Sequence, residues 1–262
     1  MEFIRQVIKN RNLILKMGAS GLKNKFSSTT LGTFWGFIQP IIFMLTYIFV
    51  FKYIMKAADS DGYPFITWIL PAIAMWNFIN DAIMSISSSI RGYGYLVKKV
   101  IFPIDIIPVI SFVSTFIIQG TILIVVLVIC MFYGVFPNII QLLYILFAAI
   151  CFIMSFTRLT AAVTTLVPDF GQLLTIAMQL LFWFTPVLWN TSMLGDRILS
   201  KILKCSPFAY IITGVRETFL GKEYILSNGY QYTVIFWMIT LILFVYGNYV
   251  FKKSKKEFAD VI

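Results

Sequence analysis

Histidine is absent from this 262-residue sequence, which has only three cysteines and only 12% charged residues. Because histidine is the commonest general base and a frequent zinc ligand, its absence disfavours Ser-His-Asp hydrolases and most zinc sites. The three cysteines stand apart, and Cys130 and Cys151 lie within apolar runs. Neither a disulfide framework nor a metal site is predicted.

The sequence also lacks G-x-x-x-x-G-K-[ST], the loop whose backbone N–H groups bind nucleotide phosphates. Any ATP-driven process therefore needs a second subunit. The eleven acidic residues are scattered along the chain, which disfavours a membrane enzyme of glycan metabolism, because such a site needs clustered acids or bases. We predict no enzymatic activity and no cofactor on this chain by itself.

Hydrophobic residues make up 60% of the chain, too many for one soluble domain. Residues 106–157, 170–195 and 224–251 contain no Asp, Glu, Lys or Arg. Runs of this length exceed the roughly 20 residues that cross a bilayer. Membrane lipid is therefore the expected solvent of most of the chain.

The apolar runs predict an all-α integral membrane protein, in which residues 1–262 form a single transmembrane domain. Residues 106–157 are too many for one crossing, and Gly134, Pro137 and Asn138 divide them into two. The six predicted spans are residues 34–51, 64–90, 107–132, 139–166, 170–189 and 231–251.

Two further segments are expected at the membrane surface. Residues 1–17 place apolar and polar side chains on opposite sides of a helical wheel, which is typical of an amphipathic interfacial helix. Residues 192–222 contain an apolar stretch, Pro207 to Val215, that is too short to cross. This segment predicts a re-entrant or interfacial helical hairpin before the last span.

Basic residues give the expected orientation. Six spans leave both termini on one side, whose segments carry thirteen Lys and Arg residues against seven on the other side. Since an excess of basic residues marks cytoplasmic segments, we expect cytoplasmic termini. Orientation also accounts for the net charge of +10, and no nucleic-acid partner is predicted.

The loop between the second and third spans is a candidate contact surface. Its apolar stripe beside two lysines forms an amphipathic element suited to a groove on a soluble partner. The alternative is an ordinary interfacial turn with snorkelling lysines. This candidate coupling segment consists of Leu96, Val97, Lys98, Lys99, Val100, Ile101 and Phe102.

Aromatic side chains gather at two span ends. Trp35 and Phe37 lie at the inner end of the first span, and Phe182, Trp183 and Phe184 lie near the outer end of the fifth. One interpretation is the aromatic belt of a membrane protein. The other is a sugar-stacking or gating surface along an export path.

Asp81 and Arg158 are the charges deepest in the predicted spans. Each lies about nine residues from the inner end of its span, roughly 14 Å at 1.5 Å per residue. A lone charge there costs at least roughly 2.5 to 3.5 kcal/mol, so each needs a partner. Their opposite signs predict an intramembrane ion pair. The alternative has Arg158 facing the export path, where its planar guanidinium binds a diphosphate oxygen.

Three motifs are specific in their order and spacing: Leu31-Gly32-x-x-Trp35-x-x-x-x-Pro40, Leu96-Val97-Lys98-Lys99-Val100-x-Phe102-Pro103 and Leu180-x-Phe182-Trp183-x-Thr185-Pro186. With them, the chain resembles, nearly end to end, the permease subunits of type-2 ABC exporters for lipid-linked polysaccharides. This group includes the teichoic-acid and O-antigen permeases. The run Pro64-Phe65-Ile66-x-Trp68 is closer to the Gram-positive teichoic-acid permeases.

The resemblance implies a homodimer with two ABC ATPase subunits, which bind ATP and Mg²⁺, in a bacterial inner or plasma membrane. It implies outward export of an undecaprenyl-diphosphate-linked polymer, with teichoic acid favoured and O-antigen or another polysaccharide next. In this family the N-terminal helix and the loop after span two contact the ATPase, and the last hairpin forms an outer gate. The family's common Arg-Asp is Pro168-Asp169 here, so a contact made by that arginine is not carried over.

Two other transporter classes are alternatives. An ABC exporter permease for a drug or a lipid would share this architecture. A secondary transporter would need ion sites built from midplane acidic residues or broken helices, and only Asp81 qualifies.

The purified chain is expected to hydrolyse no ATP, because it lacks a phosphate-binding loop. A phosphate-release assay should give background rates for the chain alone and a clear rate once an ATPase subunit is added. Phosphate release by the carefully purified chain alone would contradict this prediction.

Overall fold

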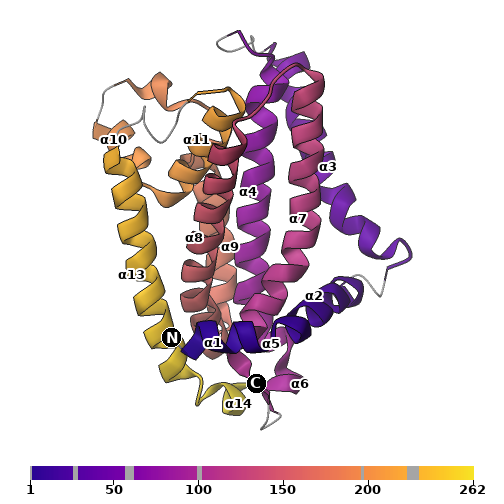
Figure 1. The fold of residues 1–262 in the computed structure, drawn as a ribbon, viewed down its shortest axis with the longest axis vertical. Helices are drawn as coiled ribbons and strands as arrows, with labels where there is room; N and C mark the ends of the chain where they lie inside the picture. The colour runs from indigo at the N-terminus through magenta and orange to yellow at the C-terminus, as the bar shows by residue number, and fades with distance from the viewer. Residues whose placement is uncertain (1, 26–28, 57–61, 99–101, 196–197, 223–229) are drawn as a thin grey trace.

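The structure, a computed structural model, describes residues 2–25, 29–56, 62–98, 102–195, 198–222 and 230–262. These residues form an elongated bundle of helices with both termini at its lower end in Figure 1. We call this the terminal end and the opposite one the far end. Among the described residues, five helices are long and apolar enough to cross a membrane. The predicted all-α membrane fold is thereby confirmed.

The long helices are α3 (Trp35–Ile48) with its π-helical continuation η2 (Phe49–Ile54), α4 (Phe65–Ser87), α7 (Ile107–Phe132), α8 (Ile139–Leu166) and α13 (Tyr230–Ser254). Most of the long helices run between the two ends of the bundle, whereas α3 begins on its flank and leads to the far end (Figure 1). Short 3-10 turns precede two of them, η1 (Gly32–Phe34) before α3 and η3 (Ile104–Ile106) before α7.

Local chemistry separates α7 from α8, which cover the same residues as the predicted third and fourth spans. Gly134 has a φ of 75°, a conformation that favours glycine, just after α7 ends. The side chain of Asn138 caps α8 by accepting hydrogen bonds from the backbone N–H groups of Ile140 and Gln141, at 3.1 and 3.3 Å. Such a cap satisfies amides at the start of the helix that have no intrahelical partner.

α4 is the buried centre of the bundle. It packs against α3, α7, α8, α9 (Asp169–Phe184) and α11 (Pro207–Phe219). Most of its side chains are buried, including Ile73, Phe78 and Ile83. A helix that is apolar around most of its circumference is stable where other elements surround it, as they do here. The other long helices each keep an apolar face exposed.

α9 carries the chain from the terminal end to the far end (Figure 1). It has only 16 residues, whereas the predicted fifth span covers 170–189. Thr185 adopts extended backbone with a ψ of 139°, because the following Pro186 disfavours the helical conformation. The helix is about 24 Å long, less than a hydrocarbon core of roughly 30 Å. The count of six crossings therefore stays a prediction.

The N-terminal segment is longer than the predicted helix at residues 1–17 and is broken. α1 (Glu2–Lys9) and α2 (Arg11–Lys25) are separated at Asn10. α2 crosses α7 closely at Gly18, whose carbonyl accepts a hydrogen bond from Ser114 Oγ at 2.6 Å. A Cβ at Gly18 would lie 2.6 Å from Val113 Cγ1, so the small residue permits this contact.

Short helices cover both ends of the bundle. At the far end, the predicted hairpin region 192–222 contains η4 (Thr191–Leu194), α10 (Ile198–Lys204) and α11, and α11 packs into the bundle against α4 and α8. At the terminal end lie α5 (Ser89–Gly92), α6 (Gly94–Val97) and α14 (Phe258–Val261).

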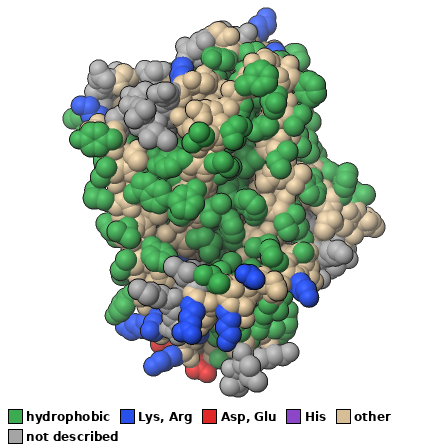
Figure 2. All heavy atoms as spheres, in the orientation of Figure 1, with side chains coloured by type: hydrophobic (Ala, Val, Ile, Leu, Met, Phe, Trp, Pro, Cys, Tyr) green, Lys and Arg blue, Asp and Glu red, His purple; other side chains and the backbone are tan. Residues whose placement is uncertain are grey.

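The surface divides into a hydrophobic middle and a basic end. Figure 2 shows hydrophobic side chains over most of the visible face and a group of Lys and Arg side chains near the terminal end. An apolar middle suits the hydrocarbon of a bilayer, and basic side chains suit one of its polar interfaces.

Gly247 permits the close approach of α13 to α8, and we expect Gly247→Val to destabilise the protein. A Cβ there would lie 3.1 Å from the carbonyl oxygen of Ser155 and 3.2 Å from the backbone nitrogen of Leu159. Overpacking of this kind costs about 1–3 kcal/mol, which should lower the Tm of the detergent-solubilised protein by several degrees.

Gly120→Val is the matched control, because the nearest atom to a Cβ at Gly120 is a Phe116 ring carbon at 3.8 Å. Its Tm should stay close to that of the unmodified protein. Equal loss of stability in both variants would show that the α8–α13 contact tolerates a larger residue.

Candidate functional site

The candidate coupling segment lies in the connection from α4 to α7, at the terminal end. Lys99, Val100 and Ile101 fall outside the described residues. The expectation of an exposed apolar stripe is wrong for Leu96 and Val97, which are only 8% and 4% exposed. Val97 lies in a cluster with Ile90, Ile107, Ala161, Ala162, Phe251 and Phe258. Val97 thus stabilises this chain's own fold, because Phe258 of the terminal helix α14 belongs to the same cluster.

Other side chains of this turn face outward. Tyr95 is 61% exposed and Lys98 is also exposed, whereas Phe102 is partly buried against the same cluster as Val97. Gly94 lies under the C-terminal residue, and a Cβ there would be 2.5 Å from Ile262 Cγ2. The turn therefore presents a ring and an ammonium group rather than an apolar stripe.

Both ends of this connection are bound to α8. On the α4 side, the guanidinium of Arg91 donates two hydrogen bonds to the carbonyl oxygen of Thr165, at 3.0 and 3.2 Å. This is one of the last carbonyls of α8, which have no intrahelical partner, and a cation is favourable at that helix end. On the α7 side, Asp105 accepts a hydrogen bond from Arg158 Nη2 at 2.9 Å.

Asp105 is the centre of a charge cluster that joins three helices. Its carboxylate lies in η3, just before α7, and binds Arg158 of α8 and Lys255, which follows α13. The Arg158 guanidinium also lies 4.3 Å from the centre of the Phe251 ring, a cation–π arrangement. The side chains of Arg158 and Asp105 are 5% and 14% exposed, so the pair is largely removed from solvent.

The predicted ion pair between Asp81 and Arg158 is corrected by this cluster. A contact of 2.6 Å between the hydroxyls of Ser87 and Thr160 aligns α4 with α8. Arg158, however, extends toward α13 and the terminal end, whereas Asp81 accepts a hydrogen bond from Gln119 of α7. The hydroxyl contact places Arg158 nearer the terminal end than Asp81, because Arg158 lies two residues before Thr160 and Asp81 lies six residues before Ser87. Depth also does not specify which way a side chain points around its helix. A long arginine side chain also reaches toward the interface, where Asp105 lies.

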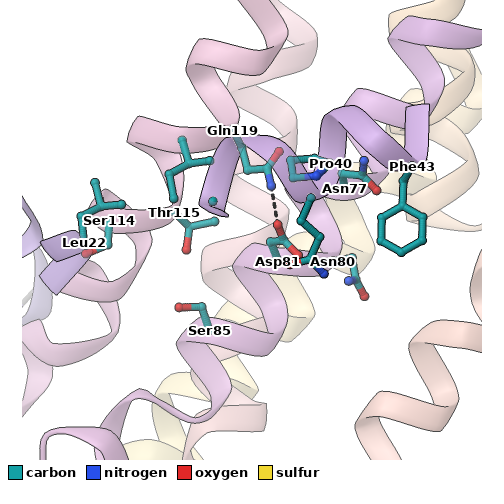
Figure 3. A pocket seen from close by; sticks show the side chains of 13 residues that line it. Leu22, Pro40, Phe43, Asn77, Asn80, Asp81, Ser85, Ser114, Thr115 and Gln119 are labelled. Atoms are coloured by element: carbon teal, nitrogen blue, oxygen red, sulfur yellow. Dashed lines mark hydrogen bonds between the residues drawn. The ribbon is translucent and has the colours of Figure 1, made fainter. Parts of the chain in front are cut away.

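Asp81 instead lines a polar pocket of about 210 Å³ among α2, α3, α4 and α7. Figure 3 shows Asp81 and Gln119 joined by their hydrogen bond, with Asn77, Asn80 and Ser85 of α4 nearby. The other lining residues are Leu22, Gly36, Gln39, Pro40, Phe43, Ser114, Thr115 and Ile118. Sequence analysis missed this site, since its polar residues come from separate spans and meet only in the fold.

The predicted path aromatics lie on two helices, α3 and α9, and the rings of Phe182 and Trp183 are in contact, with centres 5.5 Å apart. Phe182 packs against Tyr47 and Trp76, with ring centres 5.8 and 5.6 Å away, and so joins α9 to α3 and α4. Phe37 is partly buried against the core, whereas Trp35 is exposed near the start of α3. Trp183 and Phe184 are exposed at the end of α9. Their role along a path stays a prediction.

A buried arginine that sequence analysis assigned no role organises the far end. Arg216 of α11 donates hydrogen bonds to the carbonyls of Trp68, Pro186 and Val187, at 3.3, 2.9 and 2.6 Å. Its guanidinium lies 3.9 Å from the centre of the Trp68 ring. Burial lowers the pKa of Arg216 to about 9, so the group stays charged at neutral pH. The sequence signal that indicates such a role is an arginine within a short, mostly apolar segment.

Comparison with known proteins identifies the class of this bundle. Residues 13–220 match the family described as ABC-2 type transporter, and the chain belongs to this family. The chain is similar to the O-antigen export system permease protein RfbA of Klebsiella pneumoniae, with 24% identity over 259 residues, 96% of this chain and 95% of that protein. It is also similar to the RfbA of Myxococcus xanthus, with 23% identity over the full length of both.

Membership makes the chain a multi-pass membrane permease, and it implies an ABC ATPase as partner. No group of three or more Cys, Asp or Glu side chains that would suit a metal ion occurs among the described residues.

Arg158 and Asp105 are expected to show strong energetic coupling in a double-mutant cycle. Asp105→Asn should cost roughly 3 kcal/mol or more, because it leaves Arg158 buried without its carboxylate. Combining it with Arg158→Gln should recover part of the loss, a coupling of about 0.5–3 kcal/mol. Thermal unfolding of the purified variants measures each corner of the cycle.

The cycle of Asp81→Asn with Arg158→Gln is the internal control, and its two effects should be additive. If Asp81 coupled to Arg158 as strongly as Asp105 does, the assignment of partners made here would be wrong.

Proposed function

We propose that the chain is the membrane permease of an ATP-driven exporter that moves a lipid-linked cell-envelope polysaccharide from the cytoplasmic to the outer side. Two copies of the chain pair with two ATPase subunits, which bind ATP and Mg²⁺. The terminal end faces the cytoplasm of a bacterial cell, in agreement with the basic side chains gathered there. The polymer is carried on undecaprenyl diphosphate.

One observation carries this proposal: the connection from α4 to α7 is bonded to α8 at both of its ends. Arg91 of α5, which directly follows α4, is bonded to Thr165, and Asp105 just before α7 is bonded to Arg158. A soluble partner that displaces this turn therefore pulls on three helices together. ATP hydrolysis on another subunit can reach the membrane spans through such a connection, because packed helices move as rigid bodies.

The cargo class follows from the relatives. The similar proteins from Klebsiella pneumoniae and Myxococcus xanthus are named O-antigen export permeases, at 23–24% identity. Teichoic acid, which the motif Pro64-Phe65-Ile66-x-Trp68 favours, is the finer proposal. Both polymers share the lipid diphosphate carrier, so a single permease architecture serves either. The relatives support polysaccharide over the drug or lipid cargo of the alternative exporter.

The aromatic residues keep their proposed place along the path. Trp35 and Trp183 have exposed rings, and Phe182 anchors the end of α9 to α4. A second copy of the chain set against α3 and α9 would complete a path lined by such rings, on which sugars stack.

The exposed residues of the turn supply the test of coupling. Replacing Tyr95 and Lys98 together with alanine should weaken co-purification of the ATPase by about tenfold, the usual effect of losing an interface anchor. In cells that depend on this variant, lipid-linked polymer should accumulate on the cytoplasmic side. Chemical analysis of that polymer then distinguishes teichoic acid from O-antigen.

Tyr249→Ala is the matched control, since Tyr249 is 64% exposed but lies on α13. It should leave ATPase binding and polymer export unchanged. Normal co-purification and export in the Tyr95→Ala and Lys98→Ala double variant would remove this turn as the coupling element.

A further inference from the structure

The polar pocket among α2, α3, α4 and α7 is the part of the bundle that its packing leaves unexplained. Its volume of about 210 Å³ is more than tenfold the roughly 10–15 Å³ that a single water needs. Helices in lipid normally meet through small or apolar side chains. Ionisable groups within a membrane are costly without partners, and those present usually serve a function. A ligand whose polar groups match those of the wall would offset this cost.

Two buried amide atoms at the wall have no hydrogen-bond partner among the described residues. They are Gln119 Oε1, an acceptor on a side chain that is only 1% exposed, and Asn77 Nδ2, a donor. A buried polar atom without a partner costs about 1–3 kcal/mol. The pocket wall thus offers a ligand one acceptor, Gln119 Oε1, and one donor, Asn77 Nδ2.

Hydroxyl groups on α7 add further acceptors. Ser114 Oγ donates its hydrogen to the carbonyl oxygen of Gly18 at 2.6 Å, and Thr115 Oγ1 donates to that of Ser111 at 3.2 Å. Because each hydroxyl has one hydrogen but two lone pairs, both oxygens can still accept from a ligand.

This mixture of donors and acceptors separates the ligand classes. A metal cation would satisfy the oxygens but not the Asn77 amide hydrogens. A phosphate would be repelled by the Asp81 carboxylate, and no Lys or Arg lines the pocket among the side chains that the structure describes. A group with several hydroxyls both donates and accepts, so it satisfies each part of the wall.

The ring of Phe43 completes a wall suited to a sugar. It is 51% exposed and lies at the pocket beside Pro40 (Figure 3). The C–H faces of a pyranose pack against an aromatic ring while its hydroxyls bond to amides and carboxylates. Planar Asn, Asp and Gln side chains beside one aromatic ring supply both kinds of contact.

We infer that this pocket binds one sugar residue of the lipid-linked glycan, with Asn77, Gln119 and Thr115 as hydrogen-bonding groups and Phe43 as the stacking surface. The inference rests on the proposed function for the identity of the cargo. It places the recognition of sugar within this chain, in the half of the bundle nearer the terminal end, apart from the diphosphate of the carrier.

The test measures binding of two probes to the full-length chain in nanodiscs of phosphatidylethanolamine. One probe is a polyprenyl diphosphate that carries a single N-acetylglucosamine, and the other is the same polyprenyl diphosphate without sugar. Microscale thermophoresis should give tighter binding of the sugar-bearing probe. Asn77→Leu should weaken that binding about tenfold, the effect of one lost hydrogen bond in a closed site, and leave the sugar-free probe unaffected.

Asn77→Leu is chosen because it removes an amide nitrogen that has no partner, so the fold should tolerate it. Thr115→Val is the second variant and has a matched control in Thr121→Val. Both threonines lie on α7 and donate to the carbonyl four residues earlier, but Thr121 is exposed outside the pocket. Thr115→Val should weaken binding of the sugar-bearing probe, and Thr121→Val should not.

Three results would overturn the inference. If the sugar-bearing probe binds more tightly but both pocket variants bind it normally, the pocket is not the sugar site and the proposed function stands. If phosphatidylglycerol displaces the sugar-bearing probe at equal affinity, the pocket takes a lipid headgroup. If no form of the chain prefers the sugar-bearing probe, both the assignment of the pocket and the proposed polysaccharide cargo are wrong.

Discussion

The cost of placing polar groups in hydrocarbon governs this structure. The bilayer offers no water to a buried charge, so each charged side chain in the bundle has to find its partners within the protein. Arg158 meets Asp105 and the Phe251 ring, and Arg216 meets backbone carbonyls and the Trp68 ring. Each arginine thereby joins helices that would otherwise be held by packing alone.

The two arginines secure opposite ends of the same bundle. Arg158 ties α8 to the start of α7 and, through Asp105, to Lys255 after α13. Arg216 ties α11 to α4 and to the residues that follow α9. The central helix α4 runs between these two regions and packs against most of the other helices. The two arginine clusters are thus connected through the buried contacts of α4.

The polar pocket differs from the two arginine clusters in how its buried polar atoms are satisfied. Two of its amide atoms lack partners within the described protein, although both are buried. Nearly all buried polar atoms in native proteins have a partner, so two atoms without one at the wall of the same pocket need an explanation.

The sequence alone determined the all-α membrane fold, because long uncharged runs admit only lipid as solvent, and it placed α7 and α8, because Gly134 and Asn138 act locally. α9 ends five residues before the predicted end of the fifth span, because Thr185 takes extended backbone before Pro186 although the following residues are apolar. Only the tertiary structure decided which partners the deep charges take and which apolar stripes are covered. Depth can be counted along a helix, but Arg158 meets Asp105 and Val97 lies under α14 through the rotation and docking of whole helices. Those depend on contacts between residues far apart in the chain, which no local pattern specifies.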